Sequence, residues 1–132
     1  MWAAFEPLIA KGQQLLKNNT SHEQVVIVLM ANGNILHCLN RSVGMRSGSE
    51  YDTADEAQFL ELLRREGCPI HHIAALWNPN VVGVIPQDAP ALDVPGYHLR
   101  KGLLDLHPTN QEALILLRGE RGYNVRPLKT LF

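Results

Sequence analysis

The sequence is short of several features that would assign it to a functional class. It has only two cysteines, Cys38 and Cys68, too few for a disulfide framework or a cysteine-rich zinc site. Aromatic residues make up 6% of the chain and do not alternate with basic residues, which disfavours stacking on single-stranded nucleic acid. No apolar run approaches the ~20 residues that cross a bilayer. We therefore expect a cytoplasmic protein that binds neither nucleic acid nor membrane.

The charge composition has no excess of either sign. Twelve Lys and Arg stand against 13 Asp and Glu, for a formal net charge of -1. Such a balance lacks the electrostatic footprint of a protein that binds nucleic acid or an anionic membrane. The 132 residues, 45% of them hydrophobic, suit one globular unit with its own core. We predict a single domain over residues 1–132.

Hydrophobic patterning predicts helices that alternate with strands. The helices are expected over 1–18, from Thr53 to a terminal glycine at Gly67, and over 96–106. The strands are expected over 24–31, 34–40 and 70–77, with a short edge segment at 81–85 and a final hairpin after residue 112. Residues 86–95, with three prolines and two aspartates, are expected to form a loop. The order indicates an α/β fold, a mixed sheet of about five strands with helices on both faces.

Local signals mark the turns and the helix ends. Asn32-Gly33 predicts a tight hairpin turn in which both residues take positive φ. Thr53 and Glu56 have the spacing of a capping box at the start of the second helix. His71 and His72 are adjacent in a predicted strand, so their side chains are expected on opposite faces. Cys38 is expected to pack as a small buried hydrophobe.

The order of elements and several motifs resemble the small cytidine deaminases over nearly the whole chain. ANGNILHCLN is similar to the family's hairpin, which ends in a Cys-Asn step. TADEAQFLELLRREG is similar to its first zinc helix and PGYHLRKGLLDL to its second. ALILLRGERGYNVRPLKTLF is similar to its closing strands. The resemblance implies a three-layer fold, a small nucleoside-like ligand, and a homodimer or homotetramer in which Arg100 supports a subunit contact.

The sequence departs from the family at the positions of its zinc ligands. The positions that match the family's zinc ligands hold Ala54, Gly96 and Leu99, and none of these side chains can bind a metal ion. Hydrolytic deamination on this scaffold uses a zinc-bound hydroxide. We therefore expect no metal, no cofactor and no zinc-dependent hydrolytic deaminase. Only Glu56 matches the family's catalytic glutamate, and only Asn40 remains of its ribose-binding Asn-x-Glu.

The candidate site lies where the resemblance brings the N-termini of the two zinc helices together. Glu56 is the predicted acid–base residue, assisted by Asp55 and His98. A ligand would be held by Asn40, Thr53, Ala54, Gly96 and Tyr97. Glu56 equally suits a purely structural role in the capping box, and His98 equally suits the exposed surface of a first turn.

Two functions stay open at this point. In the first, the protein is an enzyme with zinc-independent chemistry on a nucleoside-like or amino-acid-derived heterocycle, as in bacterial biosynthesis. In the second, it is a catalytically inactive deaminase-like protein that binds a ligand or a protein partner. A bacterial immunity or regulatory protein would be of this second kind.

Overall fold

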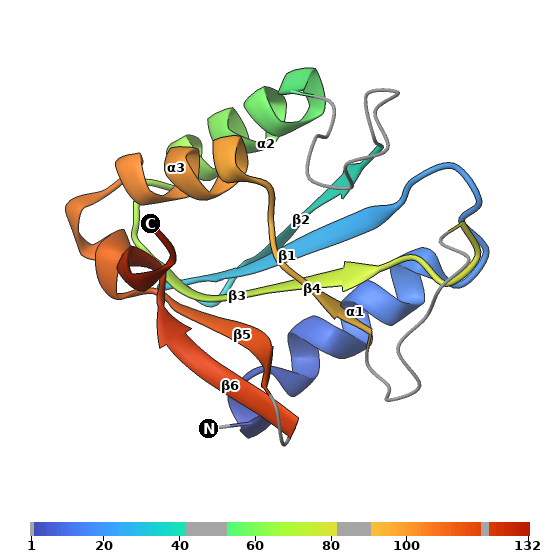
Figure 1. The fold of residues 1–132 in the computed structure, drawn as a ribbon. Helices are drawn as coiled ribbons and strands as arrows, with labels where there is room; N and C mark the ends of the chain where they lie inside the picture. The colour runs from blue at the N-terminus through green and yellow to red at the C-terminus, as the bar shows by residue number, and fades with distance from the viewer. Residues whose placement is uncertain (1, 42–52, 82–90, 120–121) are drawn as a thin grey trace.

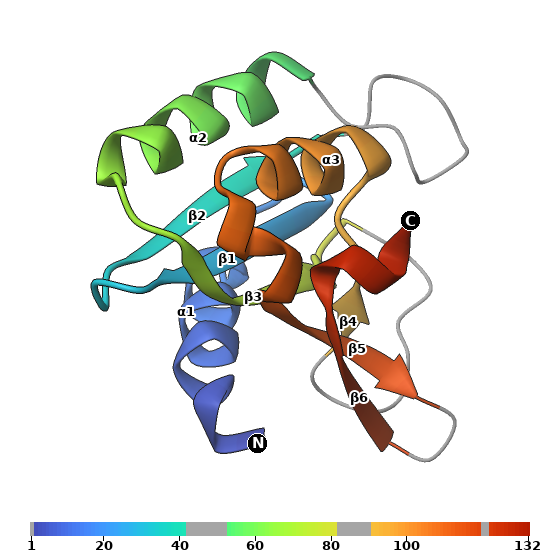
Figure 2. The same cartoon turned by 90° about the vertical axis from the view of Figure 1, so that its left-hand side faces the viewer.

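The computed structural model describes residues 2–41, 53–81, 91–119 and 122–132. These residues form a six-stranded mixed sheet with helices on both faces (Figure 1). Helix α1 (Glu6–Leu16) packs on one face, and α2 (Thr53–Glu66) and α3 (Tyr97–Asp105) lie on the other (Figure 2). The predicted three-layer α/β fold is confirmed. None of the described helices is long and apolar enough to cross a membrane.

The sheet has the order β2-β1-β3-β5-β6, and β4 pairs with β3 off this path. β3 and β5 are parallel and all other pairs are antiparallel. The parallel pair requires a crossover, which α3 supplies. The bounds are β1 (Gln24–Met30), β2 (Ile35–Asn40), β3 (Ile70–Trp77), β4 (Leu92–Asp93), β5 (Leu114–Gly119) and β6 (Gly122–Pro127).

The predicted first helix is split. Trp2–Ala4 forms a 3-10 turn and the α-helix begins at Glu6, so one continuous helix from the first residue is wrong. Pro7 explains the position of this start, because proline has no N–H to donate and is tolerated in the first helical turn. The helix ends at Leu16, two residues before its predicted end.

The hairpin between β1 and β2 is confirmed, but its turn differs from the prediction. Only Gly33 takes a positive φ, of 90°, so a turn with two such residues is wrong. The Gly33 N–H donates to the Met30 carbonyl, and the Met30 N–H donates to the Asn34 carbonyl. This is a glycine bulge, which needs the left-handed conformation at one position only.

The segment before α3 contains a strand that the sequence did not reveal. Residues 86–95 were expected to form a loop, but Leu92–Asp93 pairs with Leu76 and Ala75 of β3. The Trp77 N–H extends this pairing by donating to the Ala91 carbonyl at 2.9 Å. The edge segment predicted at 81–85 lies outside the described residues, apart from Val81.

The C-terminal part forms the predicted hairpin of β5 and β6. A short 3-10 helix, Pro108–Glu112, precedes it and another, Leu128–Leu131, follows it. Gly67 follows α2 with φ of 68°, which confirms the predicted terminal glycine.

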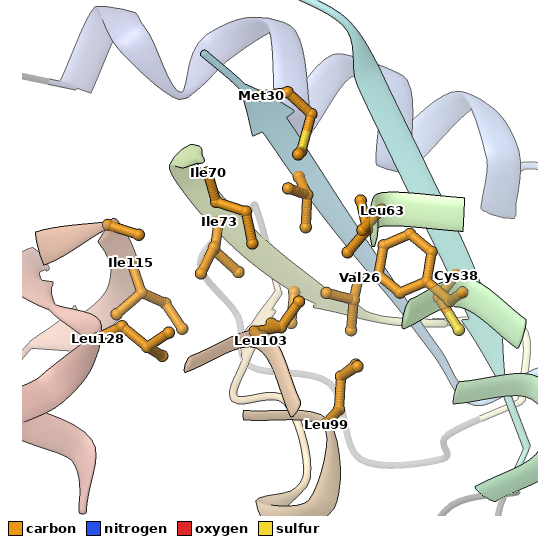
Figure 3. Close-up of a cluster of buried hydrophobic side chains, with 14 of the residues drawn as sticks. Val26, Met30, Cys38, Leu63, Ile70, Ile73, Leu99, Leu103, Ile115 and Leu128 are labelled. Atoms are coloured by element: carbon orange, nitrogen blue, oxygen red, sulfur yellow. The ribbon is translucent and has the colours of Figure 1, made fainter. Parts of the chain in front are cut away.

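Two hydrophobic clusters hold the layers together. The first lies between the sheet and α2 and α3, and includes Val26, Leu63, Ile73, Leu99 and Leu103 (Figure 3). The second lies between the sheet and α1 and includes Phe5, Leu8, Ile27 and Leu76. Each buried side chain of this size contributes about 1.5–3 kcal/mol relative to exposure. The fold is therefore stabilised on both faces of the sheet by apolar packing.

Candidate functional site

Helices α2 and α3 begin at the same end of the molecule (Figures 1 and 2). A helix N-terminus presents N–H groups that have no partner within the helix, and it carries the positive end of the helix dipole. Two such ends at one place favour a ligand with hydrogen-bond acceptors or negative charge. This is where the sequence predicts the site.

A network of buried and half-buried hydrogen bonds connects the beginnings of the two helices. Asp93, which precedes α3, accepts from Gln24 Nε2 at 2.6 Å, and Gln24 Oε1 accepts from Asn40 Nδ2 at 2.9 Å. The Cys38 thiol donates to Asn40 Oδ1 at 3.0 Å and lies 3.8 Å from the Asp55 carbonyl in α2. Gln24 and Asn40 are both 0% exposed. The network therefore fixes the two helix starts relative to each other through β1 and β2.

One member of this network was predicted from the sequence, and two were missed. Asn40 was predicted as a ligand-binding residue, and the structure engages both polar ends of its side chain within the chain. Gln24 and Asp93 were not predicted. The signal for Gln24 is its place at the start of an otherwise apolar strand, where a buried amide needs partners.

The first turn of α2 carries the predicted acidic residues. Glu56 is 4% exposed, Asp55 is half-buried, and Ala54 is exposed. The helix dipole stabilises a carboxylate in a first turn. Thr53 begins the helix, but its side chain lies outside the described part of the structure, so the capping box stays a prediction.

The first turn of α3 differs in exposure. Gly96 is the buried residue before the helix, whereas Tyr97 is 55% exposed and His98 is exposed. The Arg100 guanidinium lies 5.9 Å from the ring centroids of both Tyr97 and Phe132. The structure therefore places the C-terminal aromatic ring beside the beginning of α3. The subunit contact predicted for Arg100 stays a prediction.

The positions that would hold zinc do not fit a metal ion. Ala54 offers a methyl group and Gly96 has no side chain. Leu99 is 0% exposed and belongs to the hydrophobic cluster under α3. Among the described residues, no group of three or more His, Cys, Asp or Glu side chains could hold a metal ion. We therefore derive no catalytic step through zinc.

An open pocket of about 200 Å³ lies beside this region, between β2 and α2. Its lining includes Asp55, His22, His37 and Arg41, but not Glu56 or the first turn of α3. Burial and the nearby Arg41 lower the pKa of His22, although Asp55 opposes this. Partial removal from solvent and the positive charge of Lys11 lower the pKa of His37, although much of its surface is exposed. Both imidazoles are therefore neutral at pH 7 and can donate or accept hydrogen bonds.

The two histidines of β3 differ in their surroundings. His71 is exposed, and His72 packs edge-on against Phe5 with ring centroids 5.0 Å apart. The two imidazole rings lie 6.2 Å apart, and their placement on opposite faces stays a prediction. Cys38 is 5% exposed within the core, as predicted, and His37 is exposed.

The fold is that of the cytidine deaminases. The structure superposes on the cytidine deaminase from Bacillus anthracis with a TM-score of 0.62 and 12% identity, over 96% of this chain and 86% of that chain. The cytidine deaminase from Burkholderia pseudomallei gives 0.59 and 12%, over 96% and 95%. The one from Mycobacterium tuberculosis gives 0.57 and 14%, over 92% and 88%. No family model matches the sequence, and no curated protein matches it.

The comparison confirms the deaminase-like architecture expected from the sequence. The identities of 12–14% to these structures extend the likeness to the fold alone. The protein thus has a cytidine deaminase-like fold, and the residues at the positions matched to the zinc ligands cannot bind zinc. What it does with this scaffold is a separate question.

Proposed function

We propose that the protein acts on a small heterocyclic ligand, nucleoside-like or derived from an amino acid, at the N-termini of α2 and α3. One observation carries the proposal. Glu56, the counterpart of the deaminase glutamate, is a carboxyl group that is 4% exposed in the first turn of α2. A buried acid at the convergence of two helix N-termini suits proton transfer to or from a ring nitrogen.

The surrounding residues have distinct roles in this proposal. The backbone N–H groups of Thr53, Ala54 and Gly96 donate to acceptor atoms on the polar edge of the ligand, and the exposed ring of Tyr97 packs on its flat face. Asp55 and His98 lie in the same first turns and assist the proton transfer. In this proposal, the side chains of Glu56, Asp55 and His98 supply or take up the protons that are transferred.

A second candidate function is ligand or partner binding without catalysis. The observation that favours it is the fate of Asn40, which is 0% exposed and bonded to Gln24 and Cys38. The amide that would contact a ribose is then committed to the fold. A site without a metal and without this contact suits a regulatory or immunity protein that retained the scaffold.

The deciding experiment combines binding and turnover. NMR titrations with cytidine and uridine, and with a panel of other heterocycles, should shift the amide resonances of residues 54–56 and 96–98. Product analysis by mass spectrometry then separates the two functions. If the protein is an enzyme, Glu56→Gln should lower turnover by about 100-fold or more while ligand binding persists.

Glu61→Gln is the matched control, because Glu61 is an exposed glutamate of the same helix. This variant should retain wild-type turnover. Binding without turnover of any ligand in the panel would favour the second function. Resonance shifts confined to another face of the molecule would contradict both.

The cellular setting is part of the proposal. Two cysteines without a disulfide framework suit a reducing cytoplasm. Cys38 and Cys68 are both free thiols in the structure. We also propose that the protein is bacterial and assembles as a homo-oligomer, as the resemblance implies.

A further inference from the structure

The strand β2 forms one edge of the sheet, and no described residue pairs with its outer side. Natural edge strands are usually protected by charged residues, proline or bulges. The six residues of β2, Ile-Leu-His-Cys-Leu-Asn, contain no charged residue and no proline. The opposite edge strand, β6, carries Arg126 and Pro127. Of these two described edge strands, β2 is therefore the one without the usual protection against pairing with another strand.

The backbone of β2 is arranged for such pairing. The Met30 N–H donates to the Asn34 carbonyl, and the register with β1 then runs without a shift from Ile35 to Asn40. Hydrogen bonding alternates along an antiparallel strand. The even-numbered residues thus bond to β1, and Ile35, His37 and Leu39 direct their N–H and C=O groups outward.

Apolar surface accompanies this open edge. The pocket of about 200 Å³ between β2 and α2 is lined in part by Leu39 and by Phe59 and Leu62 of α2. Leu62 is 45% exposed and Ile35 is 36% exposed. A partner strand along β2 would shield the exposed parts of Ile35 and Leu62 from water, which contributes about 25 cal/mol for each Å² of apolar surface buried.

Opposite charges stand at the two ends of β2. Arg41 follows the strand and is exposed. At the other end, the Glu66 carboxylate is held beside the hairpin turn by Asn32 at 3.2 Å and Asn34 at 2.8 Å. These bonds lower the pKa of Glu66, so the group is anionic at pH 7. When two copies of β2 pair antiparallel, each Arg41 approaches the Glu66 of the other copy.

We propose that the protein forms a two-fold symmetric dimer in which β2 pairs antiparallel with β2 of a second copy, centred on His37. Ile35 of each copy lies opposite Leu39 of the other, so that the outward N–H and C=O groups meet. Arg41 then lies opposite Gly33 of the second copy, within reach of Glu66 beside that turn.

These features favour a second copy of the chain as the partner of β2. A single two-fold rotation brings Arg41 of each copy close to Glu66 of the other. An isologous contact uses the same surface twice and closes without leaving a free edge. The two sheets become one continuous sheet. The interface specifies the homo-oligomer of the proposed function, and it is independent of the candidate site, since neither Glu56 nor α3 contributes to it.

Light scattering coupled to size-exclusion chromatography measures the mass of the protein in solution and so tests the dimer. A charge swap between Arg41 and Glu66 is the decisive comparison. Wild type should elute at about twice the 14.7 kDa chain mass. Arg41→Glu and Glu66→Arg should each weaken dimerisation roughly tenfold or more, because each places like charges together at both ends. The double variant should restore the dimer. Arg126→Glu, the same change on the opposite edge, should leave the mass unchanged.

A backbone variant tests the strand pairing itself. His37→Pro removes an outward N–H that β1 does not use, so the folded monomer should persist by circular dichroism while the dimer is lost. A wild-type monomer at all concentrations would overturn the proposal. So would a dimer that survives both His37→Pro and Arg41→Glu, a double charge swap that fails to restore it, or open-ended aggregates.

Discussion

At the scale of single residues, Gln24 shows how one buried amide can organise a site. It is 0% exposed and begins β1, on the sheet beneath the two helix starts. Its Nε2 donates to Asp93 at 2.6 Å and to the Val94 carbonyl at 3.0 Å. Its Oε1 accepts from Asn40 at 2.9 Å. A buried polar group that is fully bonded specifies a geometry that apolar packing alone does not.

Replacing this amide should therefore be costly. Gln24→Leu removes the bonds to Asp93 and Asn40 inside the protein, and should lower the free energy of unfolding by about 1–3 kcal/mol. Urea unfolding measures this loss. Gln58→Leu makes the same exchange at an exposed position of α2 and should change stability by less than about 0.5 kcal/mol. Equal effects of the two variants would show that the network contributes little.

His72 predicts a stability that depends on pH. Burial, and secondarily His71, lower the pKa of His72 below the ordinary histidine value of 6.5. The unfolded chain then takes up a proton at higher pH than the folded one. The contribution of His72 to stability is therefore complete above pH 6.5, is lost as the pH falls below that value, and is smallest once the folded form is also protonated.

Denaturant unfolding between pH 8 and pH 5 measures this slope. His72→Phe keeps an aromatic ring against Phe5 and should flatten part of the decline in stability. Leu62→Phe, which introduces the same ring at an exposed position without changing a titratable group, should leave the slope as it is in the wild type. The assignment to His72 would be wrong if the two variants gave the same slope.

At the scale of elements, α1 lies unusually close to the sheet at Gly12. A Cβ atom built there would lie 2.5 Å from Leu76 Cδ1 and 2.7 Å from Ile27 Cδ1. Leu76 and Ile27 are buried in the second hydrophobic cluster, so their movement is restricted. Alanine favours a helix over glycine by up to about 1 kcal/mol, but overpacking of a core costs about 1–3 kcal/mol.

Gly12→Ala should therefore lower stability in spite of the better helix propensity. We expect a net loss of about 1 kcal/mol or more in the free energy of unfolding, measured by urea denaturation. Gly102→Ala in α3 is an informative comparison, since the added Cβ would meet only the partly buried Leu60. Gly102→Ala should lower the free energy of unfolding by less than Gly12→Ala does. An increase in stability for Gly12→Ala would contradict the close packing of α1.

The elements that the sequence predicted best are those with local signals at both ends. β3 begins after Pro69 and ends before a polar turn, and its bounds of Ile70–Trp77 agree with the prediction. β4 has no such signal. Its two residues are extended because Trp77 and Gln24 bond to that segment, and Gln24 is 69 residues from Asp93 in the sequence. Propensity does not encode partners so far apart.

The candidate site divides in the same way. Its place at the beginnings of α2 and α3 was predicted, because Glu56 and Gly96 occupy positions that match deaminase motifs. The roles of Gln24 and Asp93 were not, because they arise from tertiary contacts between strands and a loop. The burial of Glu56 and the exposure of His98 are likewise properties of the packed layers rather than of the motifs.

At the scale of the whole molecule, the protein has a deaminase fold whose helix starts are connected by packing and hydrogen bonds rather than by metal ligands. Leu99 occupies one of the zinc positions and is 0% exposed among apolar side chains. Gln24 of β1 and Asn40 of β2 connect the two helix starts through hydrogen bonds on the sheet. A structural metal normally contributes much of the folding energy of its site, and here the described residues supply that cohesion themselves.

The central claim is that this deaminase scaffold is complete without zinc. The most direct test is the metal content of the purified protein, measured by inductively coupled plasma mass spectrometry after expression in medium supplemented with zinc. We expect far less than one zinc per chain, and a melting temperature that a chelator does not change. One zinc per chain that survives dialysis, with a lower melting temperature after chelation, would contradict it.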